Sequence, residues 1–69
     1  MLGTVKRINR ERGFAFIART PGADVFLHVS GMLDRAQFET MQEGEQVEYD
    51  TEDSEKGVRA IRVRVVSGE

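Results

Sequence analysis

The chain has 69 residues, a formal net charge of −2, no cysteine and one histidine. We expect residues 1–69 to form one small domain, and the lack of cysteine excludes disulfides and thiolate metal sites. No apolar run approaches the length of a membrane helix and no signal-peptide core precedes the first predicted strand, so we expect a soluble cytoplasmic protein.

Three short strands are predicted in the first half of the chain. Alternating apolar residues place them at residues 2–9, 13–18 and 24–29. Polar turns that contain glycine separate these strands, at residues 9–13 and 20–24. Because short turns join neighbouring strands, the pattern predicts an antiparallel meander.

The second half of the chain begins with a longer connection. Residues 30–33 predict a short helical turn capped by Ser30, and residues 34–42 suit either a turn of helix or an irregular crossing. Alternation returns at residues 46–52 and 58–66, on either side of a polar loop at 53–57. Five short strands with one long connection predict an all-β fold, a five-stranded antiparallel OB-fold barrel, whose closure removes exposed sheet edges.

Aromatic residues occupy alternate positions of the second and third predicted strands. If the small and aliphatic residues point into the core, the alternate positions point outward, because successive side chains of a strand lie on opposite faces. The inward residues are then Ala15, Ile17, Val25, Leu27 and Val29. The outward residues are then Phe14, Phe16, Phe26 and His28. Exposed rings at this density favour stacking on unpaired nucleic-acid bases, and an idle imidazole is the alternative for His28.

The charges are distributed unevenly along the chain. Residues 1–22 carry five basic side chains and one acidic, residues 34–55 carry nine acidic and one basic, and residues 56–69 are basic again. This distribution is compatible with a positive face that attracts a polyanion despite the negative net charge. Solvated surface charges are the alternative reading. We expect Arg62 and Arg64, in the last strand, to lie off the ring-bearing face.

Several segments resemble the bacterial cold-shock domain proteins over nearly the whole chain. Residues 12–17 (Arg-Gly-Phe-Ala-Phe-Ile) resemble the first ribonucleoprotein motif of that family, and residues 24–30 (Asp-Val-Phe-Leu-His-Val-Ser) resemble the second. The opening strand at residues 3–6, the loop aromatic Phe38 with the Glu-Gly pair at 43–44, and the Lys-Gly pair at 56–57 are also similar to the family pattern.

The resemblance implies binding of single-stranded RNA or DNA by an RNA chaperone that prevents or melts secondary structure. Motif positions and neighbouring basic residues together give the expected site: Lys6, Arg7, Arg12, Phe14, Phe16, Phe26, His28, Phe38, Lys56 and Arg59. Arg10 is a further candidate for phosphate contact, and a cover over the barrel mouth is the alternative role of Phe38. We expect no cofactor and no metal, and a monomer rather than a strand-exchanged dimer.

The chain departs from the family pattern where rings are usual. After Lys6 the family usually has Trp-Phe, whereas this chain has Arg7 and Ile8, and Val29 stands where Phe is usual. The usual Gly-Pro-Gln of the last loop is Gly-Val-Arg at residues 57–59, and the segment between residues 32 and 38 is about one residue longer than usual. Because a guanidinium both stacks on bases and pairs with phosphate, we expect weaker binding than in a member with all its rings, with a steeper salt dependence.

Two other function classes remain. A protein-interaction module on the same barrel would also account for the missing rings. An enzyme is the weakest class, because one histidine, no cysteine and no carboxylates beside a nucleophile leave no evident catalytic constellation.

Overall fold

The computed structural model describes residues 1–19, 22–55 and 57–66, and it contains the five predicted strands. These are β1 (Leu2–Asn9), β2 (Phe14–Ala18), β3 (Val25–His28), β4 (Gln46–Ser54) and β5 (Gly57–Val65). Each predicted strand agrees with these bounds within two residues at either end. Two residues of the turn expected at 20–24, residues 20 and 21, lie outside the described residues.

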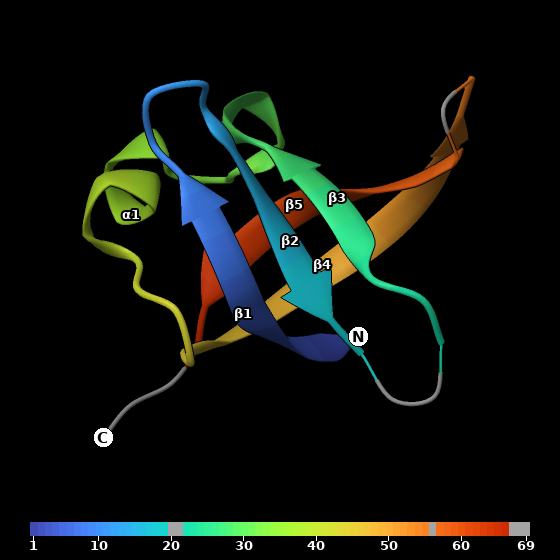
Figure 1. The fold of residues 1–69 in the computed structure, drawn as a ribbon, viewed down its shortest axis with the longest axis horizontal. Coiled ribbons are helices and arrows are strands. Elements are labelled where there is room, and N and C mark those ends of the chain that lie inside the picture. The colour runs from blue at the N-terminus through green and yellow to red at the C-terminus, as the bar shows by residue number, and fades with distance from the viewer. Residues whose placement is uncertain (20–21, 56, 67–69) are drawn as a thin grey trace.

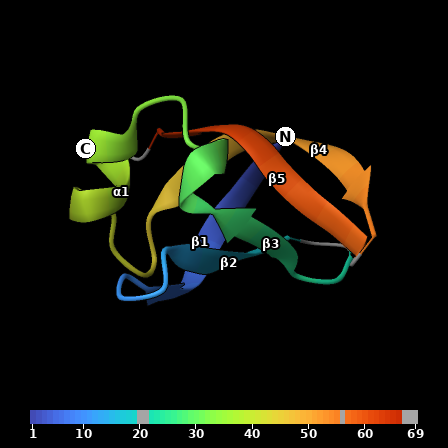
Figure 2. The same ribbon diagram turned by 90° about the horizontal axis from the view of Figure 1, so that it is seen from above.

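The strands close into a barrel in the order β1-β2-β3-β5-β4 (Figure 1). Seen from above, β1, β2 and β3 lie on one side of the barrel, and β4 and β5 on the other (Figure 2). The all-β, five-stranded barrel is therefore confirmed. Its expected antiparallel pairing needs one correction, since β3 and β5 are parallel, with Phe26 beside Arg59. Strand direction cannot alternate throughout a closed ring of five strands, so one pairing must be parallel.

The barrel interior is filled by apolar side chains from every strand. Ala15, Ile17 and Leu27 have no exposed surface, which confirms the predicted facing of the second and third strands. Among the described residues, the buried core consists of Val5, Ala15, Ile17, Val25, Leu27, Met32, Phe38, Met41, Val47, Tyr49, Ala60 and Val63. Because the buried set of β2 and β3 is aliphatic, their aromatic residues are directed to the outside of the barrel.

A β-bulge in β1 places two consecutive basic side chains on the surface. The pairing of β1 with β2 shifts register between Val5 and Arg7. Val5 is buried, whereas Lys6 and Arg7 are both exposed. An extra residue in one strand breaks the regular alternation of side chains, so neighbouring residues can share a face. The bulge thereby adds a second cation to the edge of the outer surface.

The connection between β3 and β4 contains a 3₁₀ turn, η1 (Val29–Gly31), and a helix, α1 (Arg35–Thr40). The expected helical turn is present, but His28 rather than Ser30 caps it, because its Nδ1 accepts a hydrogen bond from the Ser30 N–H. Asp34 caps α1 by accepting from the Ala36 N–H at 2.9 Å, which resolves the choice between helix and irregular crossing in favour of helix. Within the part of the chain described, no helix has the length and apolarity needed to span a membrane.

Candidate nucleic-acid interface

Three phenylalanines on β2 and β3 form a cluster on the outer surface of the barrel. The ring centroids of Phe14, Phe16 and Phe26 lie 5.7–5.8 Å from one another. Phe16 meets both neighbours nearly edge-on, at interplanar angles of 76° and 68°. Such edge-to-face contacts hold aromatic rings in a fixed mutual arrangement. We call these three residues the ring cluster.

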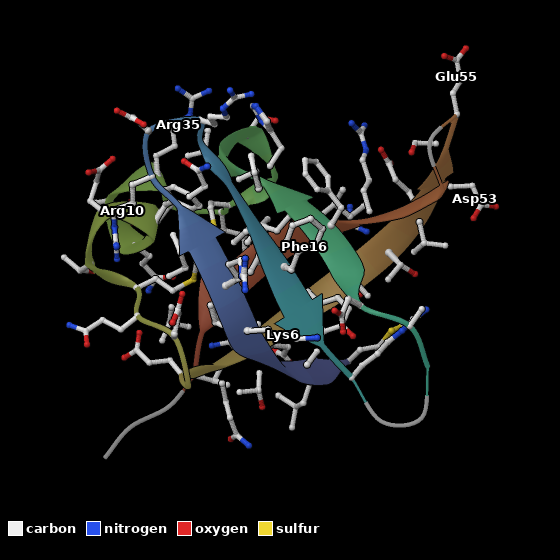
Figure 3. The ribbon with its side chains drawn as sticks, viewed as in Figure 1. Lys6, Arg10, Phe16, Arg35, Asp53 and Glu55 are labelled. Carbon is white, nitrogen blue, oxygen red and sulfur yellow. The ribbon has the colours of Figure 1, made fainter. Side chains whose placement is uncertain are left out.

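The ring cluster is only partly covered by the rest of the protein. Phe26 is 36% exposed, and Phe14 and Phe16 are half-buried. Figure 3 shows Phe16 on the outside of the sheet, directed away from the barrel interior. The outward direction predicted for these rings is therefore confirmed. Partly exposed rings that already pack on one another present an apolar surface to flat partners at little cost in conformational entropy.

The cluster belongs to a row of side chains that crosses four strands. Arg7 of β1 pairs in register with Phe16 of β2, Phe16 with Phe26 of β3, and Phe26 with Arg59 of β5. Both ends of the row therefore carry a guanidinium. A hollow of about 270 Å³ adjoins one end and is lined by Lys6, Arg7, Phe16 and Asp24. The row combines π-faces with donors for phosphate oxygens, which are the two elements of a single-strand binding groove.

His28 lies in a second, shorter row beside Phe14. The two residues are register partners on β2 and β3, and His28 is exposed. Its Nδ1 accepts from the Ser30 N–H at 3.1 Å and lies 2.9 Å from Ser30 Oγ. A nitrogen that accepts a backbone N–H carries no proton, so the neutral ring bears its proton on Nε2. The imidazole is thus held in one orientation, and its Nε2–H has no hydrogen-bond acceptor among the described residues.

Two hydrogen bonds to Asn9 fix the turn between β1 and β2, which carries Arg12. The Gly13 N–H donates to the backbone carbonyl of Asn9 at 2.9 Å, and the Arg12 N–H donates to Asn9 Oδ1 at 3.0 Å. Gly13 has φ of +75°, which other residues rarely adopt. Arg12 itself is exposed. In the Arg-Gly pair that opens the first motif, Gly13 therefore permits the turn and Arg12 is placed on the surface.

The basic residues near the ring cluster differ in their partners. Lys6 Nζ lies 3.0 Å from Asp24 Oδ2, and Arg59 Nε donates to Glu52 Oε2 at 2.6 Å. Within the described ranges, Arg7 and Arg12 take part in no ion pair. Glu52 was not among the expected site residues. The hairpin register, which pairs Ser54 with Gly57 and hence Glu52 with Arg59, was the signal that could have identified it.

Arg10 and Phe38 do not lie at the ring cluster. Arg10 lies on the side of α1 (Figure 3), and its guanidinium donates to the Met41 carbonyl. Phe38 is 1% exposed and belongs to the core, so in this structure it offers almost no surface to a ligand. The physical reason is that α1 buries its one large apolar side chain against the barrel, as an amphipathic helix does. Lys56, also expected at the site, lies outside the described residues.

The opposite side of the barrel is charge-compensated. Arg62 pairs with Asp50 and Arg64 with Glu48, which links β4 to β5 on a face away from the ring cluster. With Glu52, three of the nine acidic side chains at residues 34–55 are paired with arginines of β5, and the positions of Arg62 and Arg64 agree with the prediction. Among the residues that the structure describes, no group of three or more His, Cys, Asp or Glu side chains is placed to hold a metal ion.

Comparison with known proteins links this geometry to one family. The 'Cold-shock' DNA-binding domain matches residues 1–66. The chain is 41% identical over 61 residues to the major cold shock protein of Streptococcus pyogenes, which covers 88% of this chain and 90% of that protein. It is 43% identical over 63 residues to cold shock-like protein CspC of Bacillus cereus, with coverage of 91% and 95%. Cold shock protein 2 of Lactiplantibacillus plantarum is 42% identical over 62 residues, with coverage of 90% and 92%. The chain therefore belongs to the cold-shock domain family of nucleic-acid-binding proteins.

Proposed function

We propose that this protein binds single-stranded RNA or DNA across the ring cluster and acts as an RNA chaperone. The observation that carries the proposal is the set of three mutually packed, partly exposed phenylalanines on the outer surface of β2 and β3. Unpaired bases stack on such rings, and each stacked base contributes about 1–3 kcal/mol. His28 extends the surface beside Phe14, and Arg7 and Arg12 supply donors for phosphate oxygens.

Selectivity for single strands follows from the geometry of stacking. A base within a duplex already has both faces covered, so a ring on a protein surface reaches it only after the strands separate. Because the protein binds the open strand and not the duplex, mass action shifts RNA toward unpaired conformations without an energy source or cofactor. The proposed role is therefore binding rather than catalysis. We also propose that residues 1–69 act as one domain, as a monomer, in the cytoplasm.

The test replaces rings and measures binding of a short, unstructured oligonucleotide. In Phe16→Ala and Phe26→Ala, each loss of a stacked base lowers affinity by about 1–3 kcal/mol, and His28→Ala has a smaller effect. Leu33→Ala is the control, because Leu33 lies in the connection between β3 and β4, outside the ring cluster, and its 61% exposed side chain is also apolar surface that truncation removes. NMR chemical shifts during the titration report both affinity and the face that is contacted.

Retention of the fold is checked by circular dichroism and urea unfolding. If the variant that lacks Phe16, Phe26 and His28 together is folded and still binds the oligonucleotide like the wild type, the proposal is refuted. A protein-interaction module on the same barrel would then be the better explanation. Chaperone action has its own assay, since an RNA hairpin labelled with a fluorophore and quencher should open when the protein is added in excess.

A further inference from the structure

Two of the cations beside the ring cluster are already engaged by carboxylates. Lys6 is paired with Asp24 and Arg59 with Glu52, whereas Arg7 and Arg12 make no ion pair among the described residues. A nucleic-acid phosphate that approaches Arg59 must therefore compete with a group of the same charge. At Arg7, no carboxylate among the described residues competes in this way.

The Arg59–Glu52 pair is well placed for this competition. The two residues are direct register partners on β5 and β4, and Arg59 is also the register partner of Phe26. Glu52 Oε2 accepts a hydrogen bond from Nε of Arg59 and is also in ion-pair contact with its Nη2. Those two nitrogens form the fork with which an arginine binds a phosphate in bidentate fashion. The carboxylate thus occupies one of the phosphate-binding edges of the guanidinium at the β5 end of the row.

We propose that Glu52 is an intramolecular competitor of nucleic-acid phosphate at Arg59. In the wild-type protein, the sugar-phosphate backbone is then held on the β1–β2 side of the ring cluster by Arg7 and Arg12, with the bases directed toward β5. This inference rests on the proposed function. The side chains of Arg59 and Glu52 are 48% and 40% exposed, so a phosphate can approach the guanidinium, but the pair persists in the wild-type complex. Since exposed pairs contribute up to about 1 kcal/mol, the competition lowers affinity by at most about fivefold.

Glu52→Gln tests the competition, and Glu48→Gln is its matched control. Glu48 pairs with Arg64 across the same two strands at 2.5 Å, away from the ring cluster. Each substitution removes one negative charge and releases one arginine, so any general electrostatic gain is common to both. We expect Glu52→Gln to bind hexauridine about two- to fivefold more tightly than Glu48→Gln does. We also expect only Glu52→Gln to increase the magnitude of the slope of log K against log salt concentration, by about 0.7.

Arginine replacements complete the test. Arg7→Gln should decrease the magnitude of the salt slope by about 0.7, because one phosphate contact is lost. Arg59→Gln should leave the slope unchanged in the wild type but abolish the gain in the Glu52→Gln background. The inference is overturned if Glu52→Gln and Glu48→Gln behave alike, or if Arg59→Gln alone lowers the slope as Arg7→Gln does. Failure of the wild type to bind hexauridine would overturn the proposed function together with this inference.

Discussion

Replacing Arg7 by tryptophan exchanges a phosphate contact for a stacking surface. Arg7 is exposed on the β1 bulge, in register with Phe16, and lines the hollow of about 270 Å³ beside that ring. An indole at this position has room to lie along the row and extend the ring cluster onto β1. The family pattern usually has tryptophan here, so the exchange also restores a ring that this chain lacks.

The two effects of Arg7→Trp have different salt dependence. One more stacked base contributes about 1–3 kcal/mol, or roughly five- to 150-fold in affinity, and this gain is nearly independent of salt. Loss of one phosphate contact decreases the magnitude of the slope of log K against log salt by about 0.7. This corresponds to about a fivefold difference in affinity over a tenfold change in salt. The advantage of Arg7→Trp over the wild type should therefore be largest at high salt and smallest at low salt.

Arg7→Ala separates the two contributions, because it removes the charge without adding a ring. Its salt slope should equal that of Arg7→Trp, and its affinity should be lower than that of the wild type at every salt concentration. Titrations of hexauridine between about 0.05 and 0.5 M salt, followed by fluorescence anisotropy, measure both quantities. An unchanged slope in Arg7→Trp would mean that Arg7 contacts no phosphate, and equal affinities of the two variants would mean that no base reaches position 7.

Three substitutions probe the core and its effect on the site. Phe38→Leu should remain folded and bind the oligonucleotide with an affinity within about twofold of the wild type. If Phe38 stacked on a base, the same substitution would weaken binding by about 1–3 kcal/mol. Tyr49→Phe should raise the free energy of unfolding by about 1 kcal/mol in urea denaturation, because the buried Tyr49 hydroxyl has no hydrogen-bond partner among the described residues. A lower stability would show that this hydroxyl is satisfied. Gly31→Ala should lower the unfolding free energy by about 1–3 kcal/mol, because its Cβ would lie 2.7 Å from the Ala60 carbonyl oxygen; an unchanged value would mean that the backbone yields freely.

The facing of the strands and the meander of the first three strands could be predicted because both depend on local pattern. Aliphatic residues at 15, 17, 25 and 27 alternate with rings, and only one facing buries the aliphatic set. Glycine-containing turns set the sequence of strands. The parallel β3–β5 contact carries no local signal, since it joins residues 26 and 59, which come together only when the barrel closes.

The role of Phe38 could not be predicted because its surroundings in sequence are polar. Residues 34–40 include three charged side chains and read as a solvated crossing. The Asp34 cap instead starts a six-residue helix, and the one large apolar side chain of that helix is directed into the core. A single buried residue in a short helix gives no periodicity to detect, so the sequence could not decide between ligand contact and a cover over the barrel mouth.

Charge pairing is the feature of the site that depends most on tertiary structure. It changes the expected slope of log K against log salt concentration. Five basic residues were expected at the interface, and five phosphate contacts would give a salt slope of about −3.5. With Lys6 and Arg59 engaged by carboxylates, Arg7 and Arg12 alone give a slope of about −1.4, or about −2.1 with one contact from Lys56. A measured slope near −3.5 for hexauridine would show that phosphate displaces both carboxylates. A slope near −1.4 to −2.1 would show that the ion pairs of the free protein persist in the complex, so that local compensation, rather than the number of cations, determines the electrostatic part of binding.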